Sequence, residues 1–185
     1  MPATLCDADN SILLVIDIQQ RLASAMPDKV LQAVTRHTGW LLQAADSLGI
    51  PVVRTEQYPK RLGETLPEIK QHIWQDTRLE KSCFSCCGAE GFQKTLSQLG
   101  RKQIILTGME SHVCVLQTAM ELKMAEYDVF VVNNAVCSRE KRNHKNALQR
   151  MGQAGIVISN TESVMFEWLR DASHPKFKEV SKLLR

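Results

Sequence analysis

Short runs of branched apolar residues alternate along this chain with segments whose apolar residues recur at helical spacing. The run Ile12–Ile16 ends at Asp17, and its unbroken apolar character is typical of a strand buried on both faces of a parallel sheet. The next segment predicts a helix from about Asp28 to Leu48, which Gly49 ends. Because this alternation continues along the chain, we expect an α/β fold of three layers, with helices on both faces of a parallel, Rossmann-like sheet.

The same patterns give the expected order of elements. Strands are expected at residues 12–16, 51–55, 103–107, 128–132 and 156–159. Helices are expected at residues 28–48, 89–99, 111–125 and 140–153, with two more that start at 161 and about 174. Residues 56–80 contain Pro59, Gly63 and Pro67 and predict an irregular, substrate-facing segment. Because the sequence shows no repeat, linker or low-complexity tract, we expect a single domain over residues 1–185.

Charge and composition exclude several classes of partner. The 23 Lys and Arg residues and the 20 Asp and Glu residues are interspersed, so the net charge of +3 favours neither nucleic acid nor an anionic membrane. No apolar run approaches the length of a membrane span. The first ten residues carry acids and no basic segment, so we expect neither a signal nor a transit peptide. Six cysteines are too few for a disulfide scaffold of this size, so we expect reduced thiols and a cytoplasmic location.

Ligands of such sheets bind beyond the carboxyl ends of the strands, and two chemically active residues lie there. Asp17 ends the first strand, and Cys114 lies one turn inside the helix that follows the third. The positive end of that helix favours the thiolate, which Lys81 would stabilise if it faced the same crevice. Nucleophile, base and cation together would form an acyl-transfer site. On this ground we expect Cys114 to alkylate faster than the other five cysteines near neutral pH.

Each of these residues also has a purely structural interpretation. Cys114 suits the buried face of a core helix as a small apolar residue. Asp17 could cap a turn at the end of its strand, and Lys81 could be a solvated surface lysine. Physical chemistry alone leaves both interpretations open.

Several motifs in order make the chain similar to a known family. It resembles the isochorismatase-like cysteine hydrolase superfamily, whose pattern is a strand-ending D-x-Q, a mid-chain lysine and G-x-x-[ST]-x-x-C at a helix start. The flanking segments resemble the isochorismatase domain-containing subgroup. The matching segments are Leu14–Gln19, Thr55–Pro59, Glu80–Ser82, Gly108–Val115, Thr161–Glu167 and His174–Lys178.

The resemblance implies a role for each motif residue. Cys114 would be the nucleophile, Asp17 the general base, and Lys81 the cation that tunes both. A cis peptide bond would join Met109 to Glu110, and the N–H groups of Glu110 and Cys114 would form an oxyanion hole. The implied reaction is attack on an amide carbonyl, loss of ammonia or amine, and hydrolysis of a thioester by water.

The sequence departs from the pattern of some family members, so their metal and their reactions are not expected here. Nicotinamidase-like members hold a metal with an Asp and two His after the second strand, but here residues 56–60 contain no histidine. We therefore expect no metal and no cofactor, and chelators should leave activity unchanged. Isochorismatase itself lacks the cysteine, so hydrolysis of a vinyl ether is not implied.

Four further residues are candidates for the lining of the pocket: Gln19, Tyr58, Cys83 and His112. His112 lies two residues before Cys114, and such helical neighbours do not face each other, which favours a place at the pocket edge over a direct catalytic role. Cys83 begins a C-x-x-C that has no second ligand pair for zinc and does not follow the first strand, as a redox motif normally would. We expect these thiols to pack near Lys81.

The sequence therefore predicts a hydrolase of a small amide or related acyl compound, without a cofactor. Members of the family commonly assemble, so the resemblance also implies a homo-oligomer. Two alternatives stay open at this point. One is a catalytically idle oligomeric scaffold of the same fold. The other is a ribonuclease, which the near-neutral charge and the lack of an aromatic-basic stripe disfavour.

Overall fold

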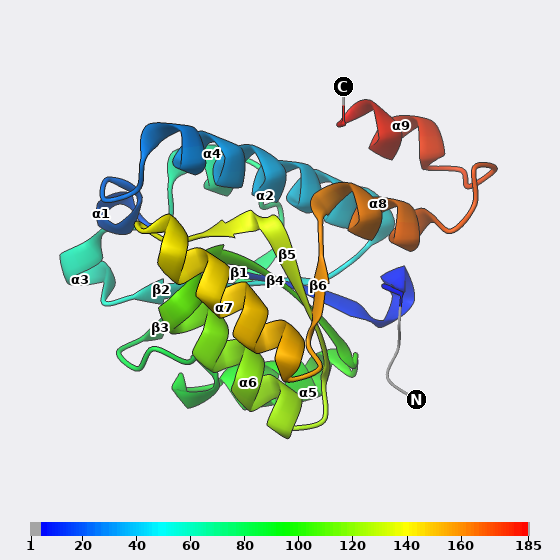
Figure 1. Ribbon diagram of the computed structural model, residues 1–185. Helices are drawn as coiled ribbons and strands as arrows, with labels where there is room; N and C mark the ends of the chain where they lie inside the picture. The colour runs from blue at the N-terminus through cyan, green and yellow to red at the C-terminus, as the bar shows by residue number, and fades with distance from the viewer. Residues whose placement is uncertain (1–4, 185) are drawn as a thin grey trace.

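A single parallel sheet of six strands forms the centre of the molecule (Figure 1). The computed structural model describes residues 5–184. The strand order is β3-β2-β1-β4-β5-β6, and every neighbouring pair is parallel. The strands are β1 (Ser11–Ile16), β2 (Val52–Gln57), β3 (Asp76–Lys81), β4 (Gln103–Met109), β5 (Asp128–Cys137) and β6 (Val157–Ser159). The predicted α/β fold is thereby confirmed.

Helices cover both faces of the sheet and complete the three layers (Figure 1). The longer helices α2 and α8 lie on one face and α5, α6 and α7 on the other. The α-helices are α1 (Gln20–Ala23), α2 (Asp28–Leu48), α3 (Pro59–Leu62), α4 (Pro67–Lys70), α5 (Phe92–Leu99), α6 (Leu116–Met124), α7 (Lys141–Gln153), α8 (Thr161–Leu169) and α9 (Phe177–Lys182). Three shorter turns are the 3₁₀ turns η1 (Ala8–Asn10) and η2 (Cys86–Gly88) and the π-helical turn η3 (Ser111–Val115).

The central strand β1 separates two hydrophobic cores. Leu13 and Val15 contribute to the core beneath α2 and α8, whereas Ile12, Leu14 and Ile16 contribute to the core beneath α5, α6 and α7. Every residue of β1 is buried, because successive side chains of a strand point to opposite faces and helices cover both. This is why the strand carries an unbroken apolar run rather than an alternating one.

The segment 56–80 is more regular than expected, which corrects the prediction of an irregular loop. It contains α3, α4 and the edge strand β3. Of the six β3 residues only Lys81 is buried, so the strand lacks the apolar run that identified the others. The buried carboxylate of Glu56 organises the segment. It binds Arg54 Nη1 at 2.8 Å, Arg78 Nη1 at 2.7 Å and the Thr65 backbone N–H at 2.9 Å.

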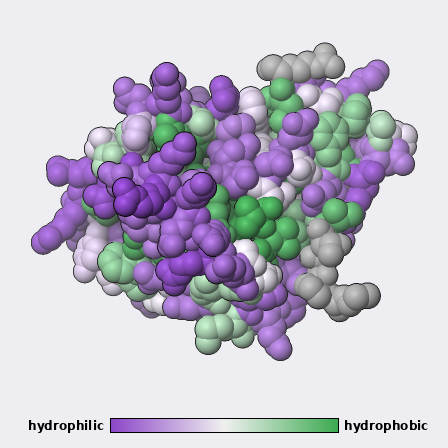
Figure 2. Space-filling view, viewed as in Figure 1, coloured by the Kyte–Doolittle hydropathy of each residue, from purple (hydrophilic) through white to green (hydrophobic). Residues whose placement is uncertain are grey.

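The molecular surface seen in Figure 2 is mostly hydrophilic, with a hydrophobic area near β6, between α7 and α8. Val157 and Ile158 on this edge strand are partly buried. Within residues 5–184, no helix combines the length and the apolar character that crossing a membrane requires.

Strand order brings four chain segments to one edge of the sheet. Lys81 and Gln57 are paired in register at the carboxyl ends of β3 and β2. Asp17 follows β1 directly, and η3, which carries Cys114, follows β4. Because parallel strands end at the same edge, four neighbouring strands deliver their terminal residues to a common place.

Gly108 permits β4 to approach β1 closely at this edge. Its φ is +120°, and an added Cβ would overlap the backbone of Ile16. We expect Gly108→Ala to lower the free energy of unfolding by about 3 kcal/mol or more, because backbone atoms cannot move aside as a side chain can. Urea denaturation measures this loss.

Gly100→Ala is the matched control for that substitution. Gly100 also has a positive φ, +64°, but an added Cβ would meet nothing within 4 Å. Its expected loss is only about 1–2 kcal/mol, from the left-handed backbone alone. Equal unfolding midpoints for the two variants would contradict the close approach.

Candidate functional site

Asp17, Lys81 and Cys114 meet at the carboxyl edge of the sheet. Lys81 Nζ lies 2.6 Å from Asp17 Oδ2 and 3.6 Å from Cys114 Sγ. The side chains of Asp17 and Lys81 are fully buried, and Cys114 is 5% exposed. The structure thus brings together the three residues that the sequence singled out, within about 6 Å of one another as a catalytic triad requires.

The Lys81 ammonium is held by several oxygen atoms besides that of Asp17. It donates to Gln57 Oε1 at 2.7 Å and to the carbonyls of Phe84 at 3.0 Å and Cys83 at 3.2 Å. Burial alone would lower the pKa of Lys81, but the Asp17 carboxylate, with smaller contributions from Cys114 and Cys86, outweighs burial and raises it. Lys81 is therefore a fixed cation and does not act as a base near neutral pH.

Asp17 is held by Thr55 on the neighbouring strand. The backbone N–H of Asp17 donates to the Thr55 carbonyl at 3.2 Å, and Thr55 Oγ1 donates to Asp17 Oδ1 at 2.8 Å. Asp17 has a left-handed φ of +51°, which turns the chain out of β1. One carboxylate oxygen therefore faces Thr55 and the other faces Lys81.

The Cys114 thiol lies in a setting that opposes ionisation. Burial raises its pKa most, the Asp17 carboxylate raises it further, and Lys81 only partly offsets both. The expectation of a favoured thiolate is therefore wrong, which removes the reason to expect the fastest alkylation at Cys114. The sequence did not reveal that Lys81 already neutralises Asp17 in a dry site, where a thiolate would add an unbalanced negative charge.

This charge balance predicts the effect of Asp17→Asn. The substitution removes the carboxylate that raises the pKa of Cys114 and leaves the Lys81 cation unbalanced. We expect the pKa of Cys114 to fall by at least one unit, so alkylation by iodoacetamide near neutral pH should accelerate about tenfold. Peptide mapping at several pH values measures this rate, and an unchanged or slower rate at Cys114 would contradict the charge balance.

The turn that carries Cys114 differs from the α-helical start expected there. Residues Ser111–Val115 form a π-helical turn, which α6 continues. Ser111 does not cap it, because its hydroxyl contacts His144 Nδ1 at 2.9 Å and Glu110 occupies the cap position. The Met109–Glu110 peptide bond is cis.

Glu110, at the start of this turn, has a hydrogen-bonded carboxylate and an unpaired backbone N–H among residues 5–184. Its carboxylate accepts from the Arg139 backbone N–H at 2.9 Å and from Arg139 Nε at 3.1 Å. Its own backbone N–H has no acceptor among residues 5–184. This N–H is therefore free to donate to a ligand.

Two of the candidate lining residues are engaged elsewhere. His112 Nδ1 contacts Ser138 Oγ at 2.9 Å, and Nε2 lies 3.4 Å from the side chain of Asn143, so the ring is directed at the segment that leads into α7. Gln19 is fully buried and binds backbone groups of Gln57 and Gly63. Neither side chain contacts a triad residue.

Two adjoining hollows lie near Lys81, and Tyr58 lines both. A hollow of about 260 Å³ is lined by Tyr58, Pro59, Lys60, Glu80, Lys81 and Ser82. A second, of about 440 Å³, is lined by Gln57, Tyr58, Arg61, Leu62, Ser82 and Phe84. Their combined size suits a small molecule. Cys83 contributes its carbonyl to Lys81, and the neighbouring thiol in the site is that of Cys86, 3.7 Å from Thr55 Oγ1.

Two polar residues of the site, Thr55 and Gln57, were missed as triad partners. Gln57 is the last residue of β2, so the rule that ligands bind at carboxyl ends could have identified it. Its link to Lys81 depends on β3, which the sequence did not reveal. Thr55 lies in one of the motif segments, and its hydrogen bond to Asp17 depends on the pairing of β1 with β2.

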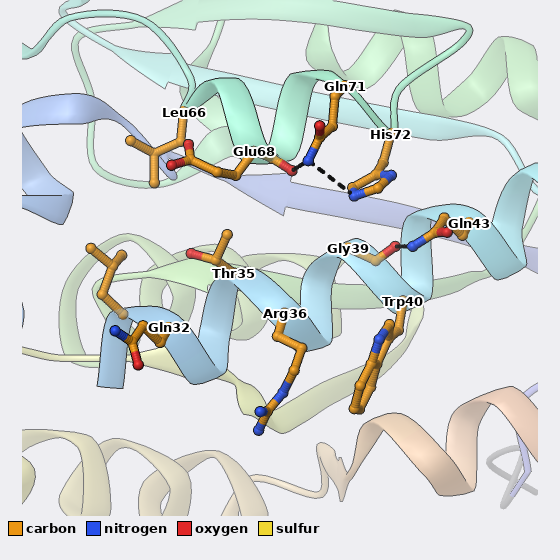
Figure 3. Close-up of a pocket in the computed structure, with 11 residues that line it drawn as sticks. Gln32, Thr35, Arg36, Gly39, Trp40, Gln43, Leu66, Glu68, Gln71 and His72 are labelled. Carbon is orange, nitrogen blue, oxygen red and sulfur yellow. Dashed lines mark hydrogen bonds between the residues drawn. The ribbon is translucent and has the colours of Figure 1, made fainter. Parts of the chain in front are cut away.

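Another hollow, of about 450 Å³, lies between α2 and α4, away from the triad (Figure 3). Trp40 and Arg36 line it from α2, with the Arg36 guanidinium 5.4 Å from the Trp40 ring centre. Glu68 lines it from α4, and Gln71 and His72 line it from the residues that follow (Figure 3). None of its lining residues belongs to the triad. Within residues 5–184, no group of three His, Cys, Asp or Glu side chains is arranged to hold a metal ion.

Comparison with known proteins identifies the family of the chain. The Isochorismatase domain family matches residues 11–163. The secreted isochorismatase effector Isc1 of Phytophthora sojae is 38% identical over 180 residues, which cover 95% of this chain and 85% of the relative. Isochorismatase domain-containing protein 2 of Danio rerio is 37% identical over 180 residues, which cover 94% of this chain and 86% of the relative.

Solved structures show the same fold. The MAR1 ribonuclease of Caenorhabditis elegans superimposes with a TM-score of 0.92 at 36% identity, over 98% of this chain and 92% of that chain. The YcaC protein of Escherichia coli, described as an octameric hydrolase of unknown specificity, has a TM-score of 0.92 at 24% identity, over 100% of this chain and 91% of that chain. From the match over residues 11–163 and the relatives above 30% identity, the chain belongs to the isochorismatase family.

Proposed function

We propose that this protein is a cysteine hydrolase that cleaves the C–N bond of a small amide or related acyl compound. The observation that carries the proposal is the Lys81 ammonium, which contacts both the Asp17 carboxylate and the Cys114 sulfur in a buried site. A nucleophile, a base and a fixed cation in this arrangement suit acyl transfer. The nearby hollows beside Tyr58 offer room for the acyl group or the leaving group.

In the first half-reaction, Cys114 Sγ attacks the amide carbonyl while its proton passes to Asp17. The site keeps zero net charge through this transfer, because the thiol and carboxylate become a thiolate and a carboxylic acid beside the same Lys81 cation. The raised pKa of Cys114 therefore favours proton transfer during attack over a stable resting thiolate. The N–H groups of Glu110 and Cys114 donate to the oxyanion, a contribution on the order of 3 kcal/mol each.

Collapse of the tetrahedral intermediate breaks the C–N bond. Asp17 returns the proton to the departing nitrogen, which leaves as ammonia or an amine, and the acyl group remains on Cys114 as a thioester. In the second half-reaction Asp17 takes a proton from water, whose oxygen attacks the thioester. The carboxylic acid product leaves, and the proton returns to the Cys114 sulfur.

The same proposal includes a single domain over residues 1–185, no cofactor and assembly into a homo-oligomer. Support for assembly comes from Tyr58 and Phe84, which line the hollow and are 53% and 54% exposed, and from the octameric structure of similar fold. The proposed location is cytoplasmic, although the relative from Phytophthora sojae is named a secreted effector.

RNA cleavage is the second candidate function, because the structural relative from Caenorhabditis elegans at 36% identity is described as a ribonuclease. The Lys and Arg residues are interspersed with Asp and Glu residues, and the net charge of only +3 gives the chain as a whole little attraction for a phosphate backbone. The buried triad also offers no open groove to a polymer.

A panel of small amides, assayed for ammonia release, tests the proposed function. Wild-type protein should hydrolyse at least one of them, and Cys114→Ala protein, the blank, should not. A single-stranded RNA substrate is run in parallel with both proteins. RNA cleavage that depends on Cys114 without amide hydrolysis would favour the ribonuclease, and no activity on either class would favour an idle scaffold.

A further inference from the structure

The side chain of Gln57 lies between the Lys81 ammonium and the hollow beside Tyr58. Its Oε1 accepts from Lys81 Nζ at 2.7 Å, and its Nε2 donates to the Ser82 carbonyl at 2.6 Å. Gln57 is 7% exposed and lines the hollow of about 440 Å³. The orientation of the amide is thereby fixed, because an ammonium can only donate and a carbonyl can only accept.

The backbone of Gln57 is also fixed, by the side chain of Gln19. The Gln57 N–H donates to Gln19 Oε1 at 2.7 Å, and Gln19 Nε2 donates to the Gln57 carbonyl at 3.0 Å. Gln19 Nε2 also donates to the Gly63 carbonyl at 2.6 Å. The backbone of Gln57 is therefore held by a fully buried amide, and its side chain is held by the Ser82 carbonyl. This arrangement gives the glutamine of the D-x-Q segment a structural purpose, two residues after Asp17.

Gln57 and Asp17 are the two nearest oxygen partners of the Lys81 ammonium, at 2.7 and 2.6 Å. The backbone carbonyls of Phe84 and Cys83 lie farther away, at 3.0 and 3.2 Å. An ammonium has three N–H groups, so when Asp17 and Gln57 accept two of them, the third is left for the two carbonyls and the Cys114 sulfur. With both in place, Cys114 Sγ lies 3.6 Å from Nζ.

We propose that Gln57 is a positioning residue, which holds the Lys81 ammonium between Asp17 and Cys114 for the hydrolysis proposed above. Through Lys81, Gln57 determines how strongly the site stabilises negative charge on the thiol. The inference rests on the proposed function for its catalytic meaning. The effect of Gln57 on the ionisation of the Cys114 thiol can be tested without any substrate.

The substrate-independent test is the rate of alkylation of Cys114 by iodoacetamide as a function of pH. Gln57→Glu is nearly isosteric and places a second carboxylate beside Lys81. We expect alkylation of Cys114 to slow by about threefold to tenfold at every pH below the pKa of the thiol, because the added charge opposes the thiolate. Gln98→Glu, the same substitution at an exposed position in the last turn of α5, is the control and should alkylate at the wild-type rate.

A second variant, Gln57→Met, removes the acceptor and keeps the length of the side chain. In amide hydrolysis we expect kcat to fall by at least about tenfold while KM stays within about twofold, because the loss lies in the reacting geometry rather than in substrate binding. Circular dichroism and thermal unfolding establish that the variants compared are folded.

Wild-type alkylation rates in Gln57→Glu, or wild-type kcat in Gln57→Met, would overturn the positioning role. A wild-type protein that hydrolyses no amide would contradict the proposed function instead. The alkylation rates would then still decide whether Gln57 acts on Cys114 through Lys81.

Discussion

Cys114→Ala protein is expected to fold normally and to lose amide hydrolysis by roughly four orders of magnitude or more. The thiol is the nucleophile of the proposed mechanism, whereas Asp17 serves as the base and Lys81 as a fixed cation, so no remaining group replaces it. The loss of free energy of unfolding should be at most about 2 kcal/mol, since a small buried side chain is shortened by one atom. Initial rates and urea denaturation on the same preparations measure both effects.

Cys6→Ala is the matched control for this substitution. Cys6 is also fully buried, but its backbone N–H binds Glu167 and it lies in the core beneath α2 and α8, away from the triad. The Cys6→Ala substitution should lower the free energy of unfolding by a similar amount and leave activity at the wild-type level. Residual hydrolysis by Cys114→Ala protein at a hundredth of the wild-type rate or above would argue against a covalent mechanism.

Lys81→Met is expected to have the largest effect on stability. It leaves the Asp17 carboxylate buried without its cation, which lowers the free energy of unfolding by about 3–5 kcal/mol. Activity should disappear as well, because the cation that contacts both Asp17 and Cys114 is removed. Urea denaturation of Lys81→Met protein measures the loss, with Lys176→Met, an exposed lysine paired with Glu179, as a control of little effect.

The pH dependence of this loss follows from the raised pKa of Lys81. The stabilisation is fully present below the pKa of an unfolded lysine, 10.5, and is lost as pH rises through the higher value of the folded protein. The difference between wild-type and Lys81→Met protein should therefore stay constant from about pH 6 to about pH 9 and narrow only at more alkaline pH. The double variant Asp17→Asn with Lys81→Met should be less destabilised than Lys81→Met alone, because no unpaired charge remains buried.

The central strands could be predicted from sequence because a strand that is buried on both faces consists of consecutive apolar residues. The runs at residues 12–16 and 103–107 are apolar for that reason, and both lie within strands of the structure. The edge strand β3 has no such apolar run. Its residues other than Lys81 and the partly buried Leu79 are exposed, and its order depends on Glu56, whose two arginine partners lie on β2 and β3.

The triad could be found from the ends of strands and from the family resemblance, but its electrostatics could not. The helix start near Cys114 and the lysine at 81 both favour a thiolate when they are considered alone. Burial and the Asp17 carboxylate reverse that balance, and both depend on packing between segments that are far apart in the sequence. The hydrogen bond between Lys81 and Gln57 could not be predicted from the sequence either, because it requires β2 and β3 to be paired.

The central claim is that Cys114 carries the acyl group during hydrolysis of an amide. It is tested most directly by acid-quenching the wild-type protein during turnover of an amide it hydrolyses, followed by intact-protein and peptide mass spectrometry. The account predicts an added mass equal to that of the acyl group, located on the peptide that contains Cys114 and removed by hydroxylamine. Steady hydrolysis with no acyl group on Cys114, together with hydrolysis retained in Cys114→Ala protein, would contradict it.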